Sequence, residues 1–185
     1  RTLSDLELVQ LLNRENEWYP RTARRILQQR AAEGKLDTGV RKALFAILVS
    51  TNDVAIKLRT IWTLHVIGGL TEDDLQDLMR NDDEYIRGWA IQLGLENHQV
   101  SPRILSQMAD MAKSDPSAVV RLYLASALQR LRLEQRWPIA RELVLGLSPE
   151  HGDTAFDLLH EDAVWTVMAH PESFPVAGDM AKAEF

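Results

Sequence analysis

One motif recurs along this chain: an acidic residue is followed five or six positions later by an arginine at the start of an apolar helix. The arginine of each copy could bind an anion. A charged groove is one interpretation. The favoured interpretation is structural, because arginines at the start of a helix can hydrogen-bond the turn groups of stacked helical hairpins. A weaker copy ends at Arg21. We expect this structural role for the three clear copies: Asp53 and Arg59, Asp82 and Arg87, Asp115 and Arg121.

Aromatic and cationic residues are concentrated at a second place, where Trp18 precedes Arg21, Arg24 and Arg25. Trp, Tyr and Arg dominate the binding energy of protein interfaces, so these four residues are a candidate interaction surface. We nevertheless expect Trp18 to pack against the neighbouring hairpin, since large aromatic side chains bury most of their area. Two further tryptophans fall on apolar helix faces and are expected in the core: Trp62 and Trp89.

The sequence predicts no catalytic, metal-binding or cofactor-binding residue. His65 is alone on an apolar helix face, and His160 and His170 lack the spacing of paired zinc ligands. Neither a GxSxG motif nor a glycine-rich phosphate loop is present. The absence of cysteine excludes disulfides, cysteine nucleophiles and covalent haem attachment within these residues.

Composition is that of a soluble globular domain, with 185 residues of which 45% are apolar and 26% charged. The net charge of −6 is uneven, because residues 1–42 hold nine basic and six acidic side chains and the remainder holds twelve and twenty-one. This distribution argues against a long nucleic-acid-binding surface but permits a local anionic contact near the N-terminus.

The longest apolar run, residues 43–49, is too short for a membrane span. No signal peptide opens the sequence, which we interpret as a fragment of a longer protein.

Apolar residues recur at helical spacing almost throughout, which predicts about ten helices in five pairs. We expect a repeat domain over residues 1–170, with hairpins near 4–34, 38–69, 71–97, 101–132 and 135–169, and a loose tail over 171–185. Serine or aspartate should cap helices at Ser4, Ser101 and Asp115, and glycine should end them at Gly34 and Gly68. In the helix near residues 54–67 the expected buried face is Leu58, Ile61, Trp62 and His65.

Repeated helical hairpins that bury their apolar faces against each other form solenoids. The predicted fold is therefore all-α, a right-handed α-solenoid of about five hairpins. Marker arginines are unevenly spaced, at 38, 28 and 34 residues from Arg21 to Arg121. HEAT and armadillo repeats tolerate such variation, whereas ankyrin and tetratricopeptide repeats are stricter.

Four strings resemble one family, the HEAT-like domain of large exported dehydrogenase-like proteins of planctomycetes and verrucomicrobia. They are Asn16-Glu-Trp-Tyr-Pro-Arg-Thr-Ala-Arg-Arg-Ile-Leu27, Leu58-Arg-Thr-Ile-Trp-Thr-Leu-His65, Ile86-Arg-Gly-Trp-Ala-Ile-Gln-Leu93 and Val120-Arg-Leu-Tyr-Leu-Ala-Ser-Ala-Leu128. The resemblance covers about residues 5–145. It implies a domain between a β-propeller and a c-type cytochrome, and hence an exported parent protein. This chain has no CxxCH motif, so no haem or dehydrogenase chemistry transfers to its residues.

The expected function is a non-catalytic scaffold that positions redox modules or docks a protein partner, in the same chain or a separate one. No membrane span and no nucleic-acid partner are expected. The alternative is a HEAT-like DNA alkylation glycosylase, an enzyme class that this chain resembles in its Arg- and Trp-bearing helical repeats, or another nucleic-acid-binding repeat protein. The acidic charge disfavours it, because phosphate neutralisation supplies much of the affinity for DNA. A protein-binding adaptor without any redox connection remains a third hypothesis.

Overall fold

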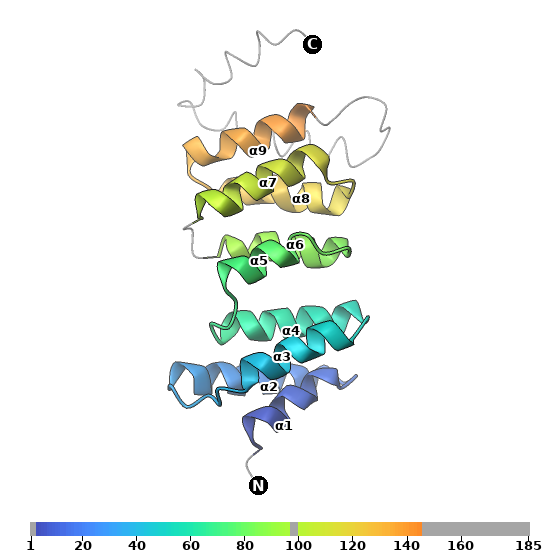
Figure 1. Cartoon of the computed structure of the whole chain (residues 1–185), viewed down its shortest axis with the longest axis vertical. Helices are drawn as coiled ribbons and strands as arrows, with labels where there is room; N and C mark the ends of the chain where they lie inside the picture. The colour runs from blue at the N-terminus through green and yellow to red at the C-terminus, as the bar shows by residue number, and fades with distance from the viewer. Residues whose placement is uncertain (1–2, 97–99, 146–185) are drawn as a thin grey trace. The chain divides into compact units, whose positions relative to one another are not determined.

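The computed structural model describes residues 3–96 and 100–145, and these residues form helices without a strand. They fall into two compact units that divide between Asp74 and Leu75, and we describe each unit separately. The α-helices of Figure 1 are α1 (Asp5–Gln10), α2 (Trp18–Ala32), α3 (Val40–Ser50), α4 (Val54–Val66), α5 (Glu72–Leu78), α6 (Glu84–Gly94), α7 (Pro102–Ser114), α8 (Ala118–Ala127) and α9 (Leu133–Leu145). Single 3₁₀ turns follow α1 and α8, at Leu11–Asn13 and Leu128–Arg130. No described helix is long and apolar enough to cross a membrane.

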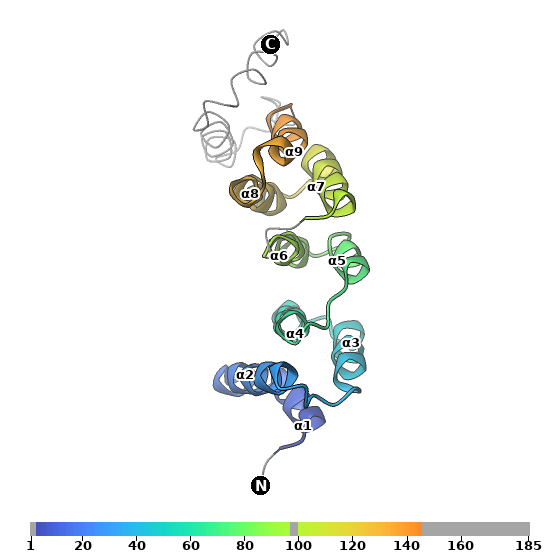
Figure 2. The same cartoon turned by 90° about the vertical axis from the view of Figure 1, so that its left-hand side faces the viewer.

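The first unit has two layers, with α1 and α3 in one and α2 and α4 in the other (Figure 2). Within each layer a helix packs on the next but one along the chain, so α1 contacts α3 and α2 contacts α4. The apolar stripes of these helices meet between the layers, which is how amphipathic helices remove their apolar faces from water. The core consists of Leu8, Val9, Leu12, Ala23, Leu27, Val40, Leu44, Ile47 and Leu64.

Short-range hydrogen bonds fix the ends of these helices. The predicted cap at Ser4 is confirmed, since its hydroxyl accepts from the Glu7 amide at 3.3 Å and the Glu7 carboxylate accepts from the Ser4 amide at 2.8 Å. The predicted stops are also confirmed. Gly34 and Gly68 have φ values of 67° and 70°. The backbone amide of the residue after each glycine donates a hydrogen bond to a carbonyl of the last helical turn.

The predicted buried face of α4 is partly wrong. The buried residues are Thr60, Ile61, Thr63 and Leu64, whereas Leu58, Trp62 and His65 are only half-buried. The two threonines can be buried because each hydroxyl donates to the carbonyl four residues earlier, at 2.8 Å for Thr60 and 2.7 Å for Thr63. An internally satisfied hydroxyl costs little to remove from water. Threonine here therefore lies on the apolar side of the helix.

In the second unit, α6 packs on α8 in one layer and α7 on α9 in the other (Figure 2). Its core is built mainly from α6 to α9 and contains Met79, Ala90, Ile91, Leu95, Ile104, Met108, Met111, Val120, Leu124, Leu128, Ile139 and Leu143, among others. Of the fifth predicted hairpin, α9 is present. Its second helix and the tail over residues 171–185 lie outside the described residues.

One of the two caps predicted in this unit is correct. Ser101 caps α7, with Pro102 as the first helical residue, and its hydroxyl accepts from the Ile104 amide at 3.2 Å. The cap predicted at Asp115 is wrong, because Ser117 caps α8 and accepts from the Val120 amide at 3.2 Å. The Asp115 carboxylate is instead occupied by an arginine from α6, as described below.

Candidate interaction surface

The solvent-facing side of α2 carries the predicted surface residues Trp18, Arg21 and Arg25. The buried side of this helix is formed by Pro20, Ala23 and Leu27. Residues at positions i, i+3 and i+7 of a helix share one face. All three surface residues are exposed, and Trp18 exposes 64% of its area. The expectation that Trp18 packs into the fold is therefore wrong. The helix begins at Trp18, and its phase turns this side chain away from the core.

A second aromatic ring stands beside Trp18. The Tyr19 ring meets the indole edge to face, with centroids 5.1 Å apart and planes at 86°, and Tyr19 is itself 42% exposed. Aromatic pairs favour this arrangement. The preceding turn is held by Asn16, whose side-chain oxygen accepts from the Trp18 amide at 3.0 Å. The two rings are therefore displayed on an ordered helix start.

Arg24 does not belong to this exposed face. Its guanidinium lies over the ring of Trp62 at 5.5 Å from the centroid, an arrangement that attracts the cation to the ring. Burial lowers the pKa of Arg24, repulsion from Arg21 lowers it further, and Glu17 acts in the opposite direction. An arginine remains charged despite such a shift. Arg24 thus connects α2 to α4 inside the first unit.

The exposed cations of this face are only weakly neutralised. The Arg21 side chain is 72% exposed and approaches Glu17 at 3.8 Å, while Glu17 is also the ion-pair partner of Arg59. Within the described residues, Arg25 forms no hydrogen bond or ion pair. An exposed pair such as Arg21–Glu17 contributes little and is readily exchanged. The positive charges of Arg21 and Arg25 are thus available to a partner.

The arginines of the repeated motif lie inside the units. In the first unit, the carboxylate of Asp53 caps α4 by accepting from the amides of Ala55 at 2.8 Å and Ile56 at 3.2 Å. Arg59 does not reach Asp53. Its guanidinium pairs with Glu17 and donates to backbone carbonyls of the turn between α1 and α2, at 3.5 Å for Leu12 and 3.3 Å for Arg14.

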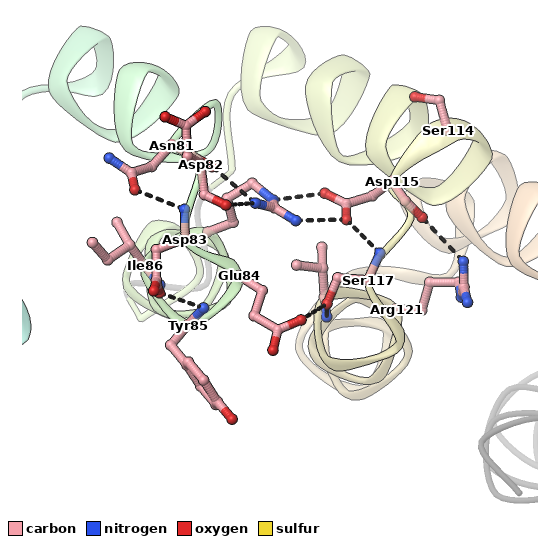
Figure 3. Close-up of polar contacts among 12 residues, drawn as sticks. Asn81, Asp82, Asp83, Glu84, Tyr85, Ile86, Ser114, Asp115, Ser117 and Arg121 are labelled. Carbon is pink, nitrogen blue, oxygen red and sulfur yellow. Dashed lines mark hydrogen bonds and ion pairs between the residues drawn. The ribbon is translucent and has the colours of Figure 1, made fainter. Parts of the chain in front are cut away.

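In the second unit, Arg87 joins two turns, and Figure 3 labels its partners Asn81, Asp82 and Asp115. It donates to the carbonyls of Asn81 and Asp82, each at 2.9 Å, and makes two 2.8 Å bonds to the Asp115 carboxylate. The side chains of Arg87 and Asp115 are only 11% and 7% exposed. The hydrogen bonds to Asp115 raise the pKa of Arg87, although burial opposes them. Arg121 repeats the local contact by donating to the Asp115 carbonyl at 3.0 Å.

Asp82, near Arg87, acts differently from the prediction. Asp82 contributes its carbonyl, not its carboxylate, and the neighbouring Asp83 caps α6 through the amides of Tyr85 and Ile86. Figure 3 also shows Glu84 accepting a hydrogen bond from the hydroxyl of Ser117. The sequence does not indicate which of the consecutive acidic residues caps the helix through its carboxylate and which accepts from Arg87 through its backbone carbonyl.

Asp5 is a further buried charge, 7% exposed, which no sequence pattern predicted. Its carboxylate pairs with Arg30 and accepts from the Asp37 amide at 2.7 Å. Burial alone would raise the pKa of Asp5, but the Arg30 and Asp37 hydrogen bonds and the charge of Arg30 together lower it. The partners lie 25 and 32 residues away, so no local spacing marks the contact.

Polar side chains also join α5 to α7 in the second unit. A hollow between α5 and α7 is lined by Gln76, Arg103 and Gln107, among others. Arg103 donates to the Gln76 side chain at 2.7 Å, and Gln107 donates to the Gln76 carbonyl at 2.9 Å. These bonds join the two helices. Across residues 3–96 and 100–145, no three His, Asp or Glu side chains are grouped so that they could hold a metal ion.

The chain matches no protein-family model and shows no significant similarity to a curated protein.

Proposed function

We propose that this chain is a non-catalytic helical-repeat scaffold of the HEAT type that binds a protein partner through the solvent-facing side of α2. The observation that carries the proposal is the exposed position of Trp18 on the same face as Arg21 and Arg25. Burying a tryptophan gains more free energy than burying most other side chains. A tryptophan left 64% exposed on a folded helix therefore retains much of that free energy for binding.

Packing within each unit supports the repeat assignment. Helices contact the next but one along the chain, α1 with α3, α2 with α4, α6 with α8 and α7 with α9. This is the nearest-neighbour packing of stacked hairpins. A recurring hydrogen bond adds to it, since Arg87 and Arg121 each donate to the carbonyl six residues earlier. We infer that the hairpins form a right-handed solenoid.

The partner proposed from the family resemblance is a module of an exported redox protein, within the same polypeptide or separate from it. In that arrangement the chain connects two modules and performs no chemistry itself. The proposal depends on binding at the α2 face, not on any reactive side chain. Turnover of a substrate by the isolated chain would refute it.

Site-specific photo-crosslinking tests this function. A photoreactive amino acid replaces Trp18 in the protein as its gene encodes it, and a matched variant carries it at Val49, an exposed apolar position on α3. We expect a crosslink from position 18 to a defined protein segment and none from position 49. Equal crosslinking at both positions would contradict the proposal. Crosslinking of position 18 to DNA alone would favour a nucleic-acid-binding function.

A further inference from the structure

We propose that the face formed by Trp18, Arg21 and Arg25 binds an acidic polypeptide segment, in which two carboxylates at alternate positions adjoin an apolar residue on the same side of the segment. The inference rests on the proposed function and adds the chemistry of the partner. The face combines an exposed indole with two exposed guanidinium groups. Tryptophan, tyrosine and arginine are the residues most often responsible for binding energy at protein interfaces.

The spacing of the two cations suits an extended acidic segment. Arg21 and Arg25 are four residues apart on α2, so their Cα atoms are separated by about 6 Å along the helix axis. Alternate side chains of an extended peptide lie on one side and are about 6.6 Å apart. Two carboxylates at positions i and i+2 of such a segment can therefore reach both guanidinium groups. Arginine can bind each carboxylate through two parallel hydrogen bonds.

The aromatic rings complete the face at its N-terminal end. Trp18 is one turn before Arg21, and Tyr19 stands against it at 5.1 Å between ring centroids. An apolar side chain beside the carboxylates would cover the indole and exclude water from the ion pairs. Charged contacts gain strength when they are desolvated in this way.

Charge distribution favours an acidic polypeptide over nucleic acid. The chain carries a net charge of −6, and beyond residue 42 acidic residues outnumber basic ones by twenty-one to twelve. A short acidic segment needs only the two guanidinium groups. A nucleic-acid duplex must place many phosphates along the protein, where the acidic remainder repels them.

The test is selection of a random-peptide display library on the immobilised chain, followed by fluorescence titration of synthetic copies of the recovered peptides. The variants are Trp18→Ala and the double charge reversal Arg21→Glu with Arg25→Glu. A matched control reverses two exposed cations elsewhere, Lys42→Glu with Arg132→Glu, and changes the net charge equally. We expect acidic peptides to be enriched and each face variant to weaken binding at least about tenfold. The control should stay within about twofold.

Four results would overturn the inference. Recovered peptides without acidic enrichment that still require Trp18 would leave the proposed function intact and refute only the acidic partner. Peptides that bind the face variants as well as the wild type would refute both proposals. Tighter binding of a short DNA duplex, or self-association of the chain that Trp18→Ala abolishes, would assign the face to nucleic acid or to a second copy.

Discussion

At the scale of single residues, the buried ion pair of Arg87 and Asp115 shows how this chain can bury charge. Removing two charges from water costs several kcal/mol per ion, and the cost is offset only when all hydrogen-bonding groups are satisfied. Arg87 donates to both Asp115 oxygens and to the carbonyls of Asn81 and Asp82. The Asp115 carboxylate also accepts from the Ser117 amide at 2.9 Å. This one arginine therefore organises two turns.

Arg87→Ala is expected to lower the free energy of unfolding by about 3–5 kcal/mol, because it leaves a buried carboxylate without its cation. The matched variant is Arg80→Ala, which removes an exposed pair to Asp77 at 3.3 Å and should cost about 0.5 kcal/mol or less. Urea unfolding curves of the two variants and the wild type measure both values. Equal losses in the two variants would show that the Arg87 contacts do not stabilise the fold.

Acid sensitivity is expected at Asp5. Its pKa is lowered in the folded state, so its contribution to stability is present above the unfolded pKa of about 3.9 and is lost as pH falls through the lower folded pKa. Asp5→Asn should be less stable than the wild type at neutral pH. That difference should shrink as the pH is lowered through and below about 4. Unfolding free energies measured across this range test the expectation, and a difference independent of pH would contradict it.

At the scale of helices, local hydrogen bonds are the part of this fold that the sequence predicts well. The caps at Ser4 and Ser101 and the stop at Gly68 depend only on residues within four positions, and all three are correct. The cap predicted at Asp115 is wrong because α8 begins two residues later, with Ser117 as its cap, and the Asp115 carboxylate binds Arg87, 28 residues away. Local spacing carries no information about such a contact.

Helix α6 contains a glycine that close packing requires. A Cβ atom at Gly88 would lie 2.6 Å from Cδ2 of the Tyr123 ring on α8. Real Cβ contacts are essentially never that short. Glycine lowers the stability of a helix by about 1 kcal/mol relative to alanine. Here that cost allows the Tyr123 ring to pack directly against the backbone of α6. Spacing alone would have predicted any small or apolar residue here.

Gly88→Ala is therefore expected to destabilise the protein by about 1–3 kcal/mol, because the ring must move and the cost exceeds the gain in helical propensity. Gly94→Ala in the same helix is the control. Its Cβ would meet only Met79 at 3.5 Å and Ile104 at 3.8 Å, so it should be neutral or stabilising by about 0.5 kcal/mol. Thermal or urea unfolding of the two variants and the wild type measures both changes in stability. Equal effects of the two substitutions would show that the contact between Gly88 and Tyr123 does not require glycine.

At the scale of the whole molecule, arginines of the same motif have two different roles. Arg59 and Arg87 lie inside their units, whereas Arg21, in the weaker copy, is on the solvent side of α2. The sequence could not distinguish these roles, because each arginine follows an acidic residue by four to six positions. The difference arises from helix phase, since α2 begins at Trp18 and buries Pro20, Ala23 and Leu27.

Because of the same helix phase, Trp18 is the residue on which the proposed function depends. The sequence located the aromatic and cationic cluster but placed the indole inside the fold, whereas the structure displays it. A partner-binding face must be separable from the core, so its central residue should contribute little to folding. A structural tryptophan would behave in the opposite way.

The most direct test is the urea unfolding free energy of Trp18→Ala, measured beside Leu27→Ala on the buried side of the same helix. We expect Trp18→Ala to remain within about 0.5 kcal/mol of the wild type, as exposed substitutions do. Leu27→Ala should lose about 2–5 kcal/mol. A loss of about 3 kcal/mol or more in Trp18→Ala would show that the indole is packed in the fold and would contradict its assignment to a binding face.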